Sequence, residues 1–115
     1  MSRRFEIYFE ETAEASLEFC EHFLIDQLAM SLDDAQTISL HLIDTATDRL
    51  SDHAATYAIC RQAAALGTHH YRELLIDNYR VVYRIWPETH AVSIYLFAHQ
   101  RQDFKQLLFQ YQMLM

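Results

Sequence analysis

The spacing of hydrophobic residues predicts a strand and two helices in the first half of the chain. Residues 4–9 alternate between apolar and polar side chains, the period-two pattern of a half-buried strand. After Thr12, a suitable N-cap, apolar residues recur every three or four positions, and this spacing resumes after Ser31, a second N-cap followed by Asp33 and Asp34. We therefore expect two helices that form an antiparallel hairpin with almost no loop. Their apolar positions are Ala13, Leu17, Cys20, Leu24 and Leu28, then Ala35, Ile38, Leu42, Ala46 and Leu50.

The segment after the hairpin carries weaker signals. Ser51 and Asp52 are expected to end or recap the second helix. The composition of residues 54–66 is helical, and Gly67 is a natural C-cap because glycine adopts a positive φ without strain. A third helix that ends at Gly67 is therefore predicted here.

After Gly67 the pattern becomes that of a β-meander. Residues 69–76, 79–86 and 90–99 are rich in β-branched and aromatic residues, and Asp77-Asn78 suits a two-residue hairpin turn. Residues 103–114 then return to helical spacing, with one apolar face formed by Phe104, Leu107, Leu108 and Tyr111.

These elements make an α+β domain. It consists of an N-terminal strand, a helical hairpin, a three-stranded antiparallel meander and a C-terminal helix, all in one domain over residues 1–115. We expect the helices to cover one face of the sheet.

Charge is distributed unevenly along the 115 residues, whose formal net charge is -7. Residues 1–60 contain three arginines and twelve acidic residues, whereas residues 61–115 contain six basic and four acidic residues. We therefore expect an anionic partner to meet the C-terminal half, although an acidic N-terminal surface is also common in soluble proteins.

Several classes of protein and site are disfavoured. The longest apolar runs are far shorter than the roughly 20 residues that span a bilayer, and the N-terminus lacks the apolar core of a secretory signal, so a cytoplasmic protein with no membrane partner is expected. Cys20 and Cys60 belong to no CxxC motif and are interpreted as small buried hydrophobes. The pair His69-His70, like His41 with Asp44, lacks further ligands at a convincing spacing, so neither a metal nor a cofactor is expected.

Residues 71–108 contain a succession of short motifs. They are Tyr71-Arg72-Glu73-Leu74, Tyr79-Arg80-Val81 with Tyr83-Arg84, an apolar strand that ends at His99, and the step His99-x-Arg101-x-Asp103 into the last helix. This succession resembles the RelE/ParE superfamily of toxins from type II toxin-antitoxin systems, also called plasmid stabilisation proteins, and the order of predicted elements fits that fold.

The resemblance implies a growth-inhibiting toxin that a cognate antitoxin silences, with two possible targets. RelE-like members cut mRNA on the ribosome, whereas ParE-like members poison DNA gyrase without nuclease chemistry. We favour the ParE-like branch because Leu74 and Leu107 stand where RelE has a lysine and a tyrosine, and because the negative charge disfavours binding to ribosomal RNA. The alternatives are a ribosome-dependent mRNA endonuclease and a non-toxic binding module. If the chain is an enzyme, its catalytic candidates are Arg72, Arg80, His99 and Arg101, with His69 or His70 as other proton-transfer groups.

Two binding surfaces are also predicted. The target-binding candidates are Arg80, Arg84 and Arg101, and we expect Arg80 and Arg101 to lie near each other. The antitoxin-binding candidates are Phe104, Leu108 and Tyr111, a face through which the free chain would also form homodimers or higher complexes with antitoxin.

These residues also have structural interpretations. Arg72 and Arg84 would pair with Glu73, Asp77 or Glu88, and Arg101 with Asp103. His99 would end its strand by bonding the backbone. The aromatic residues of the meander would pack in the core rather than stack on RNA bases; they are Tyr71, Tyr79, Tyr83 and Trp86.

Overall fold

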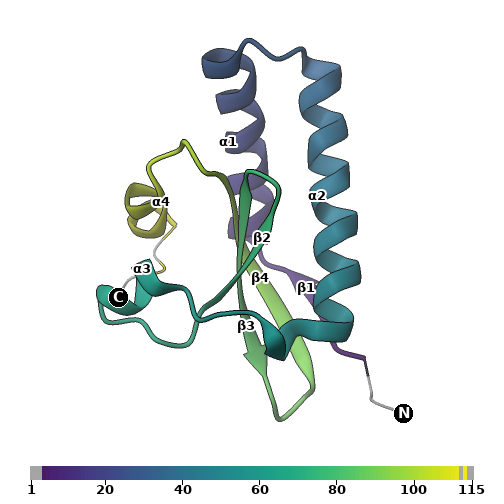
Figure 1. Ribbon diagram of the computed structural model, residues 1–115, viewed down its shortest axis with the longest axis vertical. Coiled ribbons are helices and arrows are strands. Elements are labelled where there is room, and N and C mark those ends of the chain that lie inside the picture. Colours follow the sequence, from purple (N-terminus) through teal and green to yellow (C-terminus); the bar gives the residue numbers. More distant parts are fainter. Residues whose placement is uncertain (1–3, 112, 114–115) are drawn as a thin grey trace.

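The computed structural model describes residues 4–111 and residue 113 (Figure 1). A four-stranded sheet has the order β1-β4-β3-β2, in which β1 runs parallel to β4 and the other neighbours are antiparallel. The elements are β1 (Glu6–Phe9), α1 (Glu11–Leu28), α2 (Leu32–His53), the 3-10 helix η1 (Ala54–Thr56), α3 (Arg61–Ala65), β2 (Arg72–Ile76), β3 (Tyr79–Trp86), β4 (Ala91–His99) and α4 (Phe104–Gln110).

The predicted strand, helical hairpin and meander are all present. Ser31 caps α2 as expected, because its hydroxyl accepts a hydrogen bond of 3.1 Å from the backbone N–H of Asp34. Thr12, in contrast, is not an N-cap. Helix α1 begins at Glu11 directly after β1, with Glu10 in the extended conformation as the capping residue, so Thr12 lies inside the first turn. The predicted C-terminal helix extends over residues 104–110, and residues 112 and 114 of its predicted range lie outside the described part of the chain.

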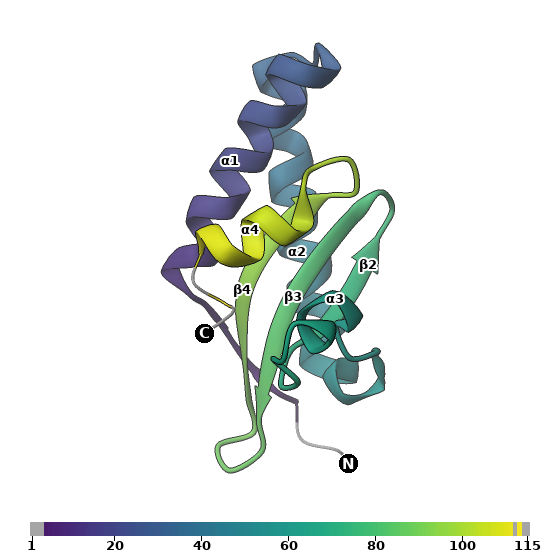
Figure 2. The same ribbon diagram turned by 90° about the vertical axis from the view of Figure 1, so that its left-hand side faces the viewer.

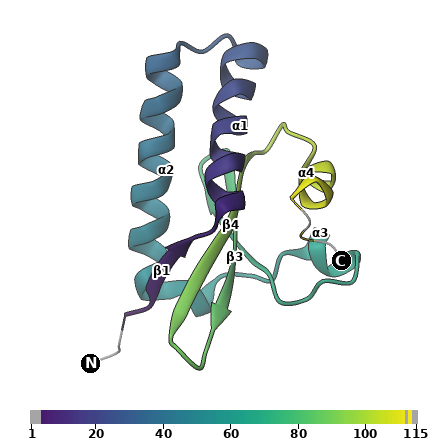
Figure 3. The same cartoon turned by 180° about the vertical axis from the view of Figure 1, so that it is seen from behind.

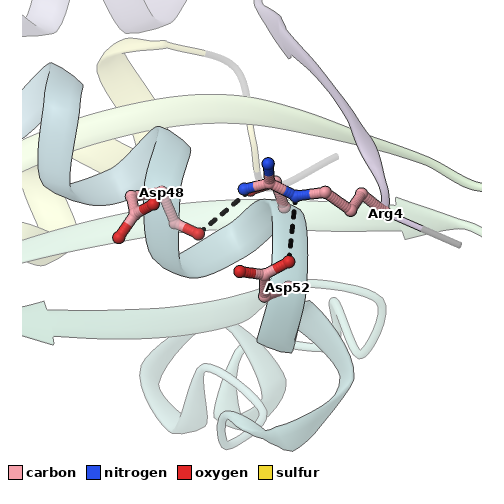
Figure 4. Close-up of polar contacts among 4 residues, drawn as sticks. Arg4, Asp48 and Asp52 are labelled. Carbon is pink, nitrogen blue, oxygen red and sulfur yellow. Dashed lines mark hydrogen bonds and ion pairs between the residues drawn. The ribbon is translucent and has the colours of Figure 1, made fainter. Parts of the chain in front are cut away.

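Helix α2 continues through Ser51 and Asp52, where a break or recap was expected. The Ser51 hydroxyl donates a hydrogen bond to the carbonyl oxygen of Asp48, one turn earlier, which suits a helix interior. Arg4 stabilises the same turn, since its Nε lies 2.9 Å from Oδ1 of Asp52 and its Nη2 donates to the Ser51 hydroxyl at 2.7 Å (Figure 4). The residues before β1 are thereby attached to the end of α2.

Residues 54–66 do not form the single helix that their composition predicts. The backbone of residues 58–60 pairs instead with the start of β2, through hydrogen bonds from Cys60 N–H to the Tyr71 carbonyl and from Glu73 N–H to the Ala58 carbonyl. This pairing leaves only η1 and the short α3. Gly67, at φ 99°, follows the end of α3 as predicted.

The helices cover both faces of the sheet, not one face as expected. The α1–α2 hairpin covers one face, and α3 and α4 cover the other (Figures 1 and 2). The central strand β4 explains the arrangement, because almost all of its residues are buried and a strand buried on both faces needs a cover on each. Two hydrophobic clusters result: Leu42, Leu50, Leu74, Val81, Tyr83 and Ile94 are in the first, and Val82, Leu96, Phe104, Leu107 and Leu108 in the second.

Strand β4 contains a β-bulge and, close to it, a hydrogen bond to α1. Val82 pairs with Leu96 but Tyr83 pairs with Ile94, so Tyr95 is an extra residue in β4. Two residues later, the Phe97 N–H donates a 2.9 Å hydrogen bond to the buried hydroxyl of Ser16 in α1. The view from behind shows β1 beside β4, with α1 starting directly after β1 (Figure 3). None of the helices in the described part of the chain combines the length and apolar character needed to cross a membrane.

Candidate functional site

The arginines of the meander lie on opposite faces of the sheet. Arg72 shares the face of Leu74 and Ile76, which belong to the cluster under the α1–α2 hairpin, whereas Arg80 shares the face of Val82, under α3 and α4. The predicted nuclease set is therefore not gathered over one concave surface.

Arg80 is bound by its own chain on three sides. Its Nε lies 3.5 Å from Oε2 of Glu73, its Nη1 donates a hydrogen bond to Oε1 of Gln62, and its guanidinium carbon lies 4.1 Å from the ring centroid of Phe104. Only 25% of its side chain is exposed. These contacts join β3 to β2, α3 and α4, which gives Arg80 a structural role that the sequence analysis did not assign.

Arg72 and Arg84 do not make the predicted ion pairs. The Nη1 of Arg72 donates a 2.6 Å hydrogen bond to the carbonyl oxygen of Tyr57, and the guanidinium of Arg84 stacks on the ring of Trp86 at 3.8 Å. The partner expected for them, Glu73, binds Arg80 instead. Asp77 lies 3.7 Å from His41 of α2.

His99 ends β4 by bonding the backbone, as its structural interpretation predicts. The Arg101 N–H donates a 3.1 Å hydrogen bond to His99 Nδ1, and the His99 N–H donates to Oε1 of Gln102 at 2.8 Å. The ring is 6% exposed and contacts Phe23 and Tyr79. Burial, and secondarily the charge of Arg101, lowers its pKa below the usual 6.5. The neutral ring is therefore a backbone acceptor at the start of the loop to α4.

This arrangement predicts a pH-dependent stability. Protonation of His99 would turn the Nδ1 acceptor into a donor facing the Arg101 N–H, and its pKa is lower in the folded than in the unfolded chain. The stabilising contribution is thus complete above pH 6.5 and is lost as the pH falls below that value. Measured by urea unfolding, the free energy of unfolding should fall more between pH 7.5 and pH 5.5 in the wild type than in His99→Asn. The amide oxygen of asparagine accepts a hydrogen bond without titrating. Equal losses in the two proteins would contradict this role.

Arg101 lies on the surface in a hollow between α1 and α4. The hollow has a volume of about 350 Å³ and is lined by aromatic residues of α1, Phe19 and Phe23, and by two carboxylates, Asp26 and Asp103. Arg80 contacts a different set of residues, Glu73, Gln62 and Phe104. The two arginines, which we expected to lie near each other, thus have different surroundings among the described residues.

The predicted antitoxin-binding residues of α4 belong mainly to the protein's own core. Leu108 is 0% exposed and Phe104 8% exposed, and both pack in the second cluster with Val82 and Leu96; Tyr111 is half-buried against the same cluster. The apolar face of α4 covers the sheet, so a partner reaches Phe104 and Leu108 only if α4 moves.

The other residues singled out in the sequence have packing roles. Tyr83 is buried and its hydroxyl donates to the Ala54 carbonyl at 2.5 Å, while Trp86 donates to the Ser93 hydroxyl at 3.0 Å. Both cysteines are free and buried, and burial raises the pKa of the Cys20 thiol to about 12, which makes it a poor nucleophile. Within residues 4–111 and 113, no three His, Cys, Asp or Glu side chains are grouped to hold a metal.

Comparison with known proteins identifies relatives of this fold. The family model of the ParE toxin of type II toxin-antitoxin systems, parDE, matches residues 7–104. The toxin-antitoxin complex RelBE2 from Mycobacterium tuberculosis contains a chain of similar fold, with a TM-score of 0.62 and 16% identity over 89% of this chain and 98% of that one. The chromosomal ParDE system from P. aeruginosa contains another, with a TM-score of 0.64 and 13% identity over 85% and 98% of the two chains. No curated protein sequence matches.

Proposed function

The chain belongs to the ParE toxin family of type II toxin-antitoxin systems, and on this premise we propose that it inhibits growth by poisoning DNA gyrase until an antitoxin binds it. The observation that carries the proposal is the match of the ParE family model to residues 7–104. The two similar folds are described in toxin-antitoxin complexes, which supports an antitoxin as the partner of this chain as well.

The placement of the nuclease candidates supports the ParE-like branch. Cutting RNA through its 2′-hydroxyl needs a base, an acid and cations that converge on one phosphate. Here Arg72 and Arg80 lie on opposite faces of the sheet, and the Nδ1 of His99 is occupied by the backbone. Leu107, where the resemblance leads one to look for a catalytic tyrosine, is buried.

The second candidate function is a ribosome-dependent mRNA endonuclease. The similarity to a chain of a RelBE2 complex favours it, at a TM-score close to that of the ParDE system. A gyrase poison damages DNA and leaves transcripts whole, whereas an mRNA endonuclease cuts transcripts. An experiment can therefore separate the two candidates.

Inducing the chain alone in a bacterial host should arrest growth and activate a DNA-damage reporter while leaving transcripts whole. With purified gyrase and supercoiled plasmid, the protein should yield linear DNA after denaturation of the enzyme. Codon-phased cuts in primer extension would support the endonuclease instead. Normal growth at high soluble expression would contradict both toxic functions and support the non-toxic binding module.

Arg84 and Arg101 are the target-binding candidates that we propose to test in the same assay. Arg84 makes a stacking contact at the sheet surface, and Arg101 is exposed. Each charge-assisted contact contributes about 1.5 to 3 kcal/mol, so replacing both with alanine should weaken toxicity by at least tenfold while the protein stays folded. Arg61→Ala, at an exposed position of α3, is the matched control. Full toxicity of the double variant would remove both residues from the candidate site.

A further inference from the structure

A basic hollow lies at the end of the sheet away from the tip of the α1–α2 hairpin. We call it the histidine hollow, after His69 and His70 before β2 and His90 in the β3–β4 turn; Arg72 is its fourth basic residue. The hollow has a volume of about 500 Å³, within the range of small-molecule sites.

The lining of the histidine hollow differs from the rest of this acidic chain. Its described lining contains no carboxylate, whereas carboxylates line four other surface hollows: Asp26 and Asp103 in one, Glu14 in the next, Glu10 and Glu11 in the third, and Glu18 in the fourth. The charge of Arg84 also acts on the hollow, because after burial it is a cause of the lowered pKa of His70. On a chain of net charge -7, an anion would thus meet Arg72, His69 and His70 in a hollow whose described lining holds no acid.

Arg72 is held in position before any ligand arrives. Its backbone bridges to Ile59, and its Nη1 donates a 2.6 Å hydrogen bond to the Tyr57 carbonyl. That bond engages one of the five N–H donors of a guanidinium, whose planar fork suits phosphate oxygens. A histidine ring donates at least one N–H whether it is neutral or charged, so the neighbouring His69 and His70 supply further donors.

The remaining surface of the hollow is apolar and partly flat. Ile59 is 48% exposed, Ile85 and Pro87 lie beside it, and the rings of Phe5 and His90 stack in parallel with centroids 4.0 Å apart. Apolar and aromatic surfaces of this kind suit the planar base of a nucleotide.

From the basic groups and the adjoining apolar surface we infer that the histidine hollow binds a nucleoside phosphate, with the phosphate on Arg72, His69 and His70 and the base against Ile59, Ile85 and Pro87. The inference is independent of the toxin's target, because it concerns a small ligand of the free chain. It gives the His69-His70 pair a ligand-binding role in place of the proton-transfer role that a nuclease would need.

Adenosine 5′-monophosphate, adenosine and inorganic phosphate distinguish the parts of this inference. Titrated into the purified full chain and followed by NMR, the monophosphate should bind with a Kd of about 1 mM or tighter and shift the amide signals of residues 69–72 and 90. Adenosine and inorganic phosphate should each bind about tenfold more weakly, because each lacks one half of the ligand.

Variants test the named residues. His69→Gln/His70→Gln should weaken binding of the monophosphate by about tenfold, and His41→Gln, at an exposed histidine of α2, should leave it unchanged. Arg72→Gln should abolish binding; if its lost bond to Tyr57 unfolds it, the double histidine variant decides. The inference is overturned by no shifts up to roughly 10 mM monophosphate, by equal affinity for inorganic phosphate and the monophosphate, or by unchanged affinity in the double histidine variant.

Discussion

Replacing Leu108 with aspartate should unfold the protein, whereas the same change at the next residue, Phe109, should leave it folded. The Leu108 side chain is 0% exposed in the cluster between α4 and the sheet, and that of Phe109 is 54% exposed on the outer side of the same helix. Removing a buried leucine side chain costs about 2 to 5 kcal/mol, and a buried carboxylate without a partner adds to this cost. The total approaches the 5 to 15 kcal/mol by which a typical domain is stable.

Circular dichroism and urea unfolding of the two variants would check this difference. We expect Leu108→Asp to lack a cooperative transition and Phe109→Asp to stay within about 1 kcal/mol of the wild type. The comparison also bears on the antitoxin. If Leu108→Asp folds normally but no longer binds the antitoxin, Leu108 contacts the partner, as the sequence predicted. That result would contradict its assignment to the core.

The hydrophobic period predicted β1 and the α1–α2 hairpin because each of those segments buries one face, whereas the meander was predicted from its β-branched and aromatic residues. The register of β2 against β3 was also predictable, since the two-residue turn Asp77-Asn78 leaves little freedom, and Asp77 adopts the positive φ of 52° that such turns need. Residues 54–66 were misinterpreted because pairing of residues 58–60 with β2 overrides their helical propensity.

The covering of both sheet faces could have been predicted from the sequence of β4. Ala91–His99 is a nearly continuous apolar run rather than an alternating one, which is typical of a strand buried on both sides. A terminal helix with one apolar face is then the natural cover for the second side. The same reasoning would have placed Phe104 and Leu108 in the core instead of at a partner surface.

The candidate site was less predictable because a motif does not say which atoms an arginine contacts. The β2–β3 register places Glu73 opposite Val82 and diagonal to both Arg80 and Arg84, so the hairpin turn leaves these two arginines as partners of the acid without choosing between them. The contacts of Arg80 with Gln62 and Phe104 depend instead on where α3 and α4 pack, and no local pattern encodes that.

Replacing Arg80 with alanine should therefore destabilise the fold by about 2 to 3 kcal/mol, a fall in Tm of roughly 10 °C. The change leaves the Glu73 carboxylate, only 19% exposed, without its cation, and its Oε2 has no hydrogen-bond partner among the described residues. The partial exposure of both side chains keeps the cost below the 3 to 5 kcal/mol of a fully buried pair. Arg84→Ala is the matched control on the same strand and face, and its stacking contact with Trp86 should contribute about 0.5 to 1 kcal/mol.

A second substitution tests whether the unpaired Glu73 carboxylate causes the loss of stability. In the Arg80→Ala background, Glu73→Leu removes the unpaired charge and should recover part of the lost stability, measured by thermal unfolding of both proteins. The single change Glu73→Leu should itself be destabilising, because it leaves Arg80 without its acid. If Arg80 served only to bind a target, Arg80→Ala would unfold at the wild-type temperature and lose toxicity, and Glu73→Leu would restore nothing. A lowered Tm with recovery by Glu73→Leu would instead establish that this arginine holds β2 and β3 together on the face that α3 and α4 cover.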